Sequence, residues 1–160
     1  MILNADMQLQ YLETRGLGSK AQVGYDVTLK AVRSINGGMV LVDKTIVDDY
    51  HDVLPIQSPT GKLLFKLDPG TYSLTFEQGC KLDNNHTAFI RHRSSVLRCG
   101  AIITSGVYDP GFEVDEMGGV MLATKPITIE KGARVAQIVV FENYTAESYR
   151  GQYYKSGDIK

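Results

Sequence analysis

The chain has few of the features that mark membrane, secreted or zinc-binding proteins. It contains two cysteines and three histidines among 160 residues, and neither their number nor their spacing suits a zinc site. No stretch reaches the roughly 18 consecutive apolar residues that a membrane-spanning helix needs. A signal-like apolar N-terminus is also missing, so Cys80 and Cys99 are predicted to be reduced thiols in the cytoplasm.

Neither positive nor negative charge is in excess. The chain has 17 Lys and Arg against 18 Asp and Glu, a net charge of −1. A protein that binds nucleic acid or an anionic membrane surface would need a basic surface. We therefore expect neither as a partner, and any anion site must be local.

The residues that are present predict one all-β domain. A chain of this length, 43% hydrophobic and 22% charged, fits a single compact domain over residues 1–160, with about 145–160 as a mobile C-terminal tail. Residues 1–22 look like a flexible lead-in. Many short apolar runs between turn signals, with little helical periodicity, are typical of a β-barrel or jelly roll.

One short stretch, residues 91–100, predicts an anion site. Ser94 or Ser95 is a good N-cap and Gly100 a good C′ residue, so one helical turn is expected between them. The start of such a turn, with a serine hydroxyl and nearby arginines, suits a phosphate chain. The alternative is an ordinary capped turn with solvated arginines. The arginines concerned are Arg91, Arg93 and Arg98.

The following residues place one carboxylate between glycines and a ring. Gly106 and Gly111 bracket Asp109, and Phe112 follows directly. Glycines let a backbone approach a flat ligand, an aspartate near an anion site can activate water, and a ring can pack against a sugar. The alternative is that Asp109–Phe112 forms only a β-turn in a hairpin.

Two polar residues lie in predicted strands. Residues 23–31 alternate apolar and polar, which puts Asp26 on the polar face of a half-buried strand. In the strand over 133–141, Gln137 is a polar member of an otherwise apolar row and needs a partner, either a phosphate oxygen or an interstrand hydrogen bond. On the other face of that strand, Ile138 and Val140 would pack either a core or a three-fold axis.

Four motifs together resemble a known family, the trimeric dUTPase and dCTP deaminase superfamily. The resemblance extends from about residue 20 to about residue 154 and implies a distorted jelly roll that assembles as a homotrimer with active sites between subunits. The motifs are Gly24-Tyr25-Asp26, Arg93-Ser94-Ser95-Val96-Leu97-Arg98, Asp109-Pro110-Gly111-Phe112 and Gly132-Ala133-Arg134-Val135-Ala136-Gln137.

The resemblance also implies a reaction, hydrolysis of dUTP to dUMP and pyrophosphate with Mg²⁺. Asp109 would activate the water, and Asp26 would lie near the Mg²⁺–triphosphate through water. The implied phosphate ligands are Arg93, Ser94, Ser95, Arg98, Gln137 and Arg150. The implied base and sugar contacts are Ile103, Thr104, Gly106, Tyr108, Phe112 and Tyr153, with Ile103 at the position of a base-reading asparagine in many dUTPases.

Other readings stay open at this point. A dCTP deaminase, or a bifunctional enzyme, would need a glutamate near the pyrimidine. The position that matches it is Ala123, which disfavours deamination, although Glu113 or Glu116 could enter the site instead. A non-catalytic nucleotide-binding protein of the same fold is the third possibility. The tail lacks the glycine-rich ending of many dUTPases.

Overall fold

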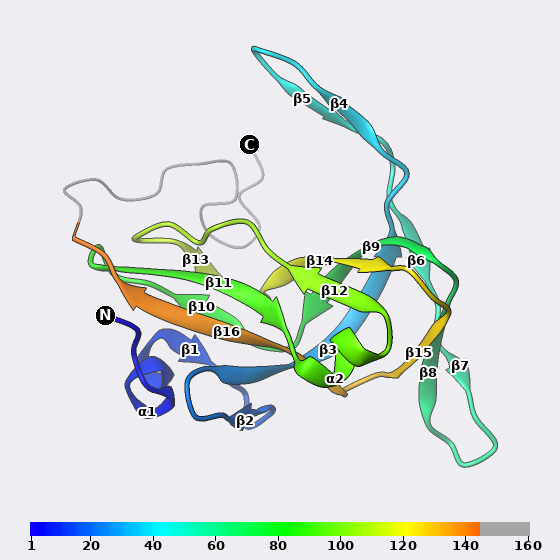
Figure 1. Cartoon of the computed structure of the whole chain (residues 1–160), viewed down its shortest axis with the longest axis horizontal. Coiled ribbons are helices and arrows are strands. Elements are labelled where there is room, and N and C mark those ends of the chain that lie inside the picture. Colours follow the sequence, from blue (N-terminus) through cyan, green and yellow to red (C-terminus); the bar gives the residue numbers. More distant parts are fainter. Residues whose placement is uncertain (145–160) are drawn as a thin grey trace.

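The computed structural model describes residues 1–144 and shows a β-rich body with one hairpin that projects from it (Figure 1). Strands make up 51% of these residues and helices 8%. The predicted all-β class is therefore confirmed. Arg150 and Tyr153, and the tail to which they belong, lie outside the described residues.

Six antiparallel strands form a closed barrel. Their order around the barrel is β16, β11, β12, β14, β9 and β3, and β16 also pairs with β3, which closes the ring. Closure removes the exposed strand edges that an open sheet would present. The bounds are β3 Tyr25–Ser34, β9 Gly70–Phe76, β11 His86–His92, β12 Ala101–Thr104, β14 Gly118–Ala123 and β16 Arg134–Glu142.

Alternation along the strands fills the barrel with apolar side chains. On β16 the inward residues Ala136, Ile138 and Val140 have no exposed area. Across the barrel they meet other fully buried side chains, Val27, Leu29, Phe76, Ile90, Ile103 and Met121. Ile138 and Val140 therefore belong to the core, which decides between the two sequence-based alternatives for them.

Short elements complete the body. Three small strands form one sheet, β1 Leu12–Glu13, β10 Gly79–Lys81 and β13 Glu113–Val114, and three form another, β7 Ile56–Gln57, β8 Leu63–Leu67 and β15 Ile127–Glu130. Two strands extend the pairing of β3, β2 Ser19–Lys20 and β6 His51–Val53. The helices are α1 Ala5–Gln8, the 3₁₀ turn η1 Leu9–Tyr11, and α2 Ser94–Arg98. Among the described residues, no helix is long and apolar enough to cross a membrane.

The N-terminal segment is part of the body, so its prediction as a flexible lead-in is wrong. Leu3 is 1% exposed, and its N–H donates to the carbonyl of Val140 at 3.0 Å. Gln8 is fully buried, and its side-chain amide donates to the carbonyls of Leu3 and Val23. The mixed composition of residues 1–22 did not reveal this packing, because the partner of Leu3, Val140, lies far along the chain.

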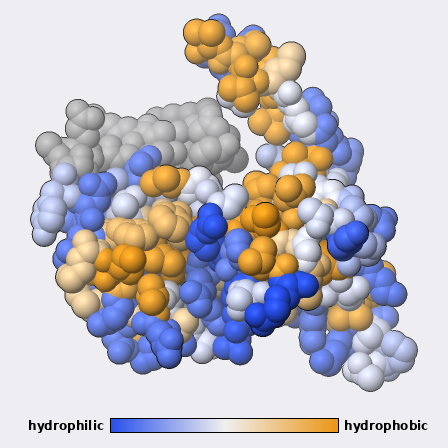
Figure 2. Space-filling view, viewed as in Figure 1, coloured by the Kyte–Doolittle hydropathy of each residue, from blue (hydrophilic) through white to orange (hydrophobic). Residues whose placement is uncertain are grey.

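The projecting hairpin consists of β4 Gly38–Val40 and β5 Thr45–Val47 (Figure 1). Its tip carries apolar side chains that are exposed to solvent (Figure 2). They are Met39, Val40, Leu41, Val42, Ile46 and Val47. Barrel closure does not use this hairpin, because none of its residues belongs to the six barrel strands.

A buried glutamine just after β9, Gln78, accepts a hydrogen bond from a backbone N–H of β3. Gln78 is fully buried, and its side-chain oxygen accepts from the N–H of Thr28 at 2.9 Å. Its amide nitrogen donates to the Thr28 hydroxyl at 2.8 Å. The Gln78 carbonyl also accepts from the N–H of Met117 at 2.7 Å, so this residue joins β3 to the loop before β14.

We expect Gln78→Leu to lower the free energy of unfolding by about 1–3 kcal/mol, because the buried N–H of Thr28 loses its acceptor. Urea denaturation followed by circular dichroism measures the change. The matched control is Gln57→Leu at an exposed glutamine of β7, for which a change within about 0.5 kcal/mol is expected. Equal losses in both variants would contradict this role for Gln78.

Candidate active site

The predicted helical turn exists as α2, but its N-cap differs from the prediction. The N-cap is Arg93, with extended φ −73° and ψ 151°, and no side chain caps the helix. The prediction of Ser94 or Ser95 as N-cap is therefore wrong, because the N–H groups of both Val96 and Leu97 donate to the carbonyl of Arg93. Both serines lie in the first turn and are exposed. Gly100 follows the C-cap with φ +81°, as predicted.

Asp26 is buried next to the start of this turn and forms an ion pair with the N-cap residue, Arg93. Its side chain is 4% exposed, and Arg93 Nε lies 3.1 Å from its Oδ2. Arg134 Nη1 lies 3.4 Å from the same oxygen, and Gln137 Nε2 donates to Oδ1 at 2.9 Å. Asp26 thus faces polar partners, as the alternation predicts, but it is buried, and a buried carboxylate needs such partners to offset its lost hydration. Its place near the Mg²⁺–triphosphate stays a prediction.

This cluster settles what Gln137 contacts within the chain. Gln137 lies opposite Asp26 in the β16–β3 ladder, and its amide makes the interstrand hydrogen bond that was one of the two alternatives. Arg93 keeps part of its donor capacity, because its Nη1 donates to the carbonyl of Arg134 at 3.2 Å while the guanidinium has five N–H groups in all. Arg98 is exposed, and no ion pair is recorded for it within residues 1–144.

The donor set does not form a protein cage for a metal ion. Within residues 1–144, no group of three or more His, Cys, Asp or Glu side chains could hold one. Both oxygens of Asp26 are engaged by Arg93, Arg134 and Gln137. Mg²⁺ often keeps several of its waters and binds through substrate phosphates, and an ion that enters in this way needs no cage of protein side chains.

The loop after β12 forms the predicted β-turn. The N–H of Phe112 donates to the carbonyl of Asp109 at 3.0 Å, and Gly111 has φ +80°. Pro110 and a positive-φ glycine at the two central positions are typical of a type II turn. Asp109 is exposed at the first position of this turn.

Two stacked rings stand beside Asp109. The rings of Tyr108 and Phe112 are 4.8 Å apart and nearly parallel. The Tyr108 hydroxyl donates to the carbonyl of Gly118 at 2.7 Å, and burial raises the pKa of this phenol, so it stays protonated. This bond fixes the ring pair against the start of β14.

These rings line a cavity of about 630 Å³, within the range of small-molecule sites. Four of the residues predicted to contact base and sugar line it together, Thr104, Gly106, Tyr108 and Phe112. The side chain of Ile103 does not, because it is fully buried in the barrel core. The other lining residues are Ser73, Ser105, Val107, Val114, Glu116, Gly118, Gly119 and Val120.

One chain does not bring Asp109 close to the arginines. Tyr108, next to Asp109, pairs with Ala88 near the start of β11. Arg93 lies five residues beyond Ala88, just after the end of β11, and five residues of extended chain span about 16 Å. The predicted site residues therefore form two separate groups within the chain.

Sequence reasoning missed one member of each group. Arg134 was quoted within a motif but given no role, although it contacts Asp26. The available signal was a cationic residue three positions before Gln137 in the same motif. Glu116 was named only as an alternative acid for deamination, yet it lines the cavity. Its position becomes visible only once the strands are placed.

Comparisons with known proteins bear on the family. A family model described as dCTP deaminase-like matches residues 7–143. A deoxyuridine 5'-triphosphate nucleotidohydrolase from Methanocaldococcus jannaschii is 31% identical over 145 residues, which cover 89% of this chain and 90% of that protein. A probable enzyme of the same name from Halobacterium salinarum is 30% identical over 132 residues, 81% of this chain and 79% of that protein.

A solved structure of similar fold was also found. The 2'-deoxycytidine 5'-triphosphate deaminase from Agrobacterium tumefaciens superposes with a TM-score of 0.60 at 14% identity. The match covers 87% of this chain but 47% of that one, so the chain spans about half the length of this deaminase. Because the family model covers most of the chain and the Methanocaldococcus relative matches nearly end to end, this chain belongs to the dCTP deaminase-like family.

Proposed function

We propose that the protein hydrolyses dUTP to dUMP and pyrophosphate. The observation that carries the proposal is the cavity of about 630 Å³ whose wall contains the ring pair beside Asp109, in a chain whose relatives are named dUTP nucleotidohydrolases. The pyrimidine and deoxyribose occupy this cavity. Phe112 packs against the sugar and leaves little room for a 2′-hydroxyl.

Asp109 is the general base of the proposed reaction. Its exposed carboxylate accepts a proton from a water, the water oxygen bonds to the α-phosphorus, and the bond from the α-phosphorus to the bridging oxygen breaks. Pyrophosphate leaves with that oxygen. Little covalent chemistry is asked of the protein, so positioning and charge neutralisation supply much of the rate.

The phosphates bind the other group of residues, around α2. Arg98 and the hydroxyls of Ser94 and Ser95 are exposed there, and Arg93 is held in place by Asp26. Charge-assisted hydrogen bonds from arginine suit phosphate oxygens. Mg²⁺ enters with the triphosphate as part of the substrate.

Assembly into a homotrimer would unite the two groups. Ala88, which pairs with the neighbour of Asp109, lies five residues before Arg93, a stretch of about 16 Å in extended chain. We therefore infer that a single chain does not bring Asp109 and Arg93 to the reacting end of one nucleotide. A neighbouring copy that contributes Asp109 resolves this separation. The proposal places the enzyme in the cytoplasm, supported by the free thiols of Cys80 and Cys99; burial raises the pKa of Cys80 to about 12.

The second candidate function is deamination of dCTP. The fold of the Agrobacterium enzyme and the carboxylate of Glu116 in the cavity wall favour it. Ala123 does not, because it is buried opposite Ala101 and carries no group that transfers protons. Incubation with Mg²⁺ and each deoxynucleoside triphosphate, with assays for pyrophosphate and ammonia, separates the two. We expect pyrophosphate from dUTP and no ammonia from dCTP; ammonia without pyrophosphate would overturn the proposal.

Asp109→Asn should lower turnover of dUTP by roughly 10²–10⁴ and leave nucleotide affinity nearly unchanged, because only the base for the water is lost. Steady-state pyrophosphate release gives the turnover, and titration with a non-hydrolysable dUTP analogue gives the affinity. Asp115→Asn, at an exposed aspartate of the same loop, is the control and should keep full turnover. Normal turnover in Asp109→Asn would remove Asp109 from the chemistry.

For Arg98→Ala we expect affinity for the triphosphate analogue to fall by about 10–100-fold, the cost of a charge-assisted hydrogen bond, while affinity for deoxyuridine stays the same. Calorimetric titration measures both. The control is Arg33→Ala, whose guanidinium pairs with Asp52 away from α2. If both ligands lose affinity equally, Arg98 is not a phosphate ligand.

A shared site predicts complementation between two impaired variants, measured at a dUTP concentration well below the KM of Arg98→Ala. Mixing Asp109→Asn with Arg98→Ala, then unfolding and refolding them together, should restore about a quarter of the sites, those that take each intact residue from a different chain. Pyrophosphate release before and after mixing reports the gain. Activity that never exceeds the sum of the separate variants would mean that the two residues act within one chain.

A further inference from the structure

The wall of the proposed nucleoside cavity contains a single charged side chain among the described residues, Glu116. Several hydroxyls in the same wall already serve the chain's own backbone. The Thr104 hydroxyl donates to the carbonyl of Ser105, that of Ser105 to the carbonyl of Gly106, and that of Tyr108 to the carbonyl of Gly118. Glu116 is therefore the strongest hydrogen-bond acceptor that the wall offers to a ligand.

The backbone next to Glu116 is fixed to the end of β9. The N–H of Met117 donates to the carbonyl of Gln78 at 2.7 Å, and the carbonyl of Met117 accepts from the N–H of Phe76 at 2.8 Å. Met117 itself is fully buried. The residue that follows Glu116 is thus anchored in the body by two backbone hydrogen bonds.

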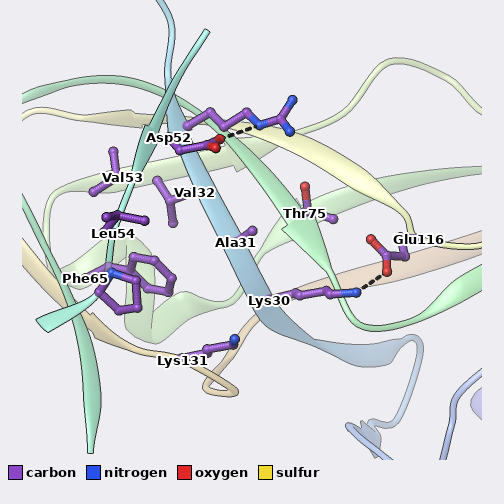
Figure 3. Close-up of a pocket in the computed structure, with 12 residues that line it drawn as sticks. Lys30, Ala31, Val32, Asp52, Val53, Leu54, Phe65, Thr75, Glu116 and Lys131 are labelled. Carbon is purple, nitrogen blue, oxygen red and sulfur yellow. Dashed lines mark hydrogen bonds and ion pairs between the residues drawn. The ribbon is translucent and has the colours of Figure 1, made fainter. Parts of the chain in front are cut away.

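Lys30 forms an ion pair with the Glu116 carboxylate. Its ammonium contacts Oε1 of Glu116 from β3 (Figure 3). Glu116 also lines a second cavity of about 320 Å³, together with Lys30, Thr75 and Lys131 (Figure 3). Glu116 thus lines both cavities, whereas Lys30 lines only the smaller one. A carboxylate offers about four lone-pair positions over its two oxygens, so it can accept from Lys30 and from a ligand together.

We propose that Glu116 reads the base by accepting a hydrogen bond from N3–H of uracil. This inference rests on the proposed function. Uracil presents a donor at N3 between two carbonyl acceptors, whereas cytosine presents a lone pair at N3. A carboxylate only accepts, so opposite N3 it pairs with uracil and repels cytosine. Glu116 thereby supplies the polar side chain that Ile103, buried in the core, does not.

Lys30 is the positioning residue in this arrangement. It does not line the nucleoside cavity, but its contact with Oε1 leaves the carboxylate in one orientation. Loss of Lys30 should therefore reduce the preference for dUTP over dCTP, while the affinity for the phosphates stays the same.

The test compares kcat/KM for dUTP and dCTP, by pyrophosphate release, in the full-length protein and in Glu116→Gln. We expect kcat/KM for dUTP to fall by about 10–100-fold, the span of a hydrogen bond to a charged group, and the preference for dUTP over dCTP to shrink by a similar factor. Lys30→Met should reduce the preference in the same direction. Glu116→Asp, which keeps the charge on a shorter side chain, replaces Glu116→Gln if that variant does not fold.

Glu113→Gln is the matched control. Glu113 lies on the same segment and pairs with Lys81 at 3.3 Å, but it lines a different cavity. The preference of Glu113→Gln for dUTP over dCTP should equal that of the unmodified protein. A second readout uses N3-methyl-dUTP, which lacks the donor: the unmodified protein should discriminate against it, and Glu116→Gln should discriminate much less.

The outcomes separate the inference from the function on which it rests. An unmodified protein that hydrolyses dUTP, combined with a Glu116→Gln variant of unchanged base preference, overturns the role of Glu116 and leaves the hydrolase standing. Ammonia from dCTP that disappears in Glu116→Gln would make Glu116 a proton-transfer group instead and overturn the inference. If the unmodified protein releases no pyrophosphate from dUTP, both the function and the inference fail.

Discussion

The buried carboxylate of Asp26 is the constraint on which the rest of the structure depends. It lies on β3 opposite Gln137 of β16, at the seam where the barrel closes. A charge at that depth is tolerated only with partners, because lost hydration must be offset by ion pairs and hydrogen bonds. Those partners come from β16 and from the residue before α2. Barrel closure and the orientation of Arg93 are therefore consequences of the same interaction.

Local patterns were sufficient wherever the governing contacts are local. The type II turn at Asp109–Phe112 follows from Pro110 and Gly111, which prefer its two central conformations, and Gly100 ends α2 for a similar reason. The barrel class followed from alternation in strands such as β3 and β16. Membership of the family could be inferred from four short motifs because each is a run of adjacent residues and their order is read directly from the sequence.

The errors share one physical cause, which is contact between residues far apart in the chain. Alternation assigned Asp26 to the polar face of its strand but did not show that it is buried, since its partner Gln137 lies 111 residues away. The N-terminal segment looked flexible because its acceptor is the carbonyl of Val140. Ser94 seemed a better N-cap than Arg93 by residue preference, but the Asp26 ion pair and the hydrogen bond from the Arg93 N–H to the carbonyl of Val135 fix the chain one residue earlier. The Asp109 and α2 groups were likewise adjacent in sequence but not in space.

The distribution of charge separates the two halves of the proposed site. The proposed phosphate side includes an arginine that is fixed by Asp26 at the seam of the barrel. The proposed base side is a loop wall in which several hydroxyls donate to the backbone, and Glu116 is the one charged lining residue among those described. Under this proposal, a change of the Glu116 side chain would alter which base is accepted without touching the seam. Specificity for the base would thus be separate from barrel closure, because Glu116 precedes β14 and takes no part in the pairing of β16 with β3.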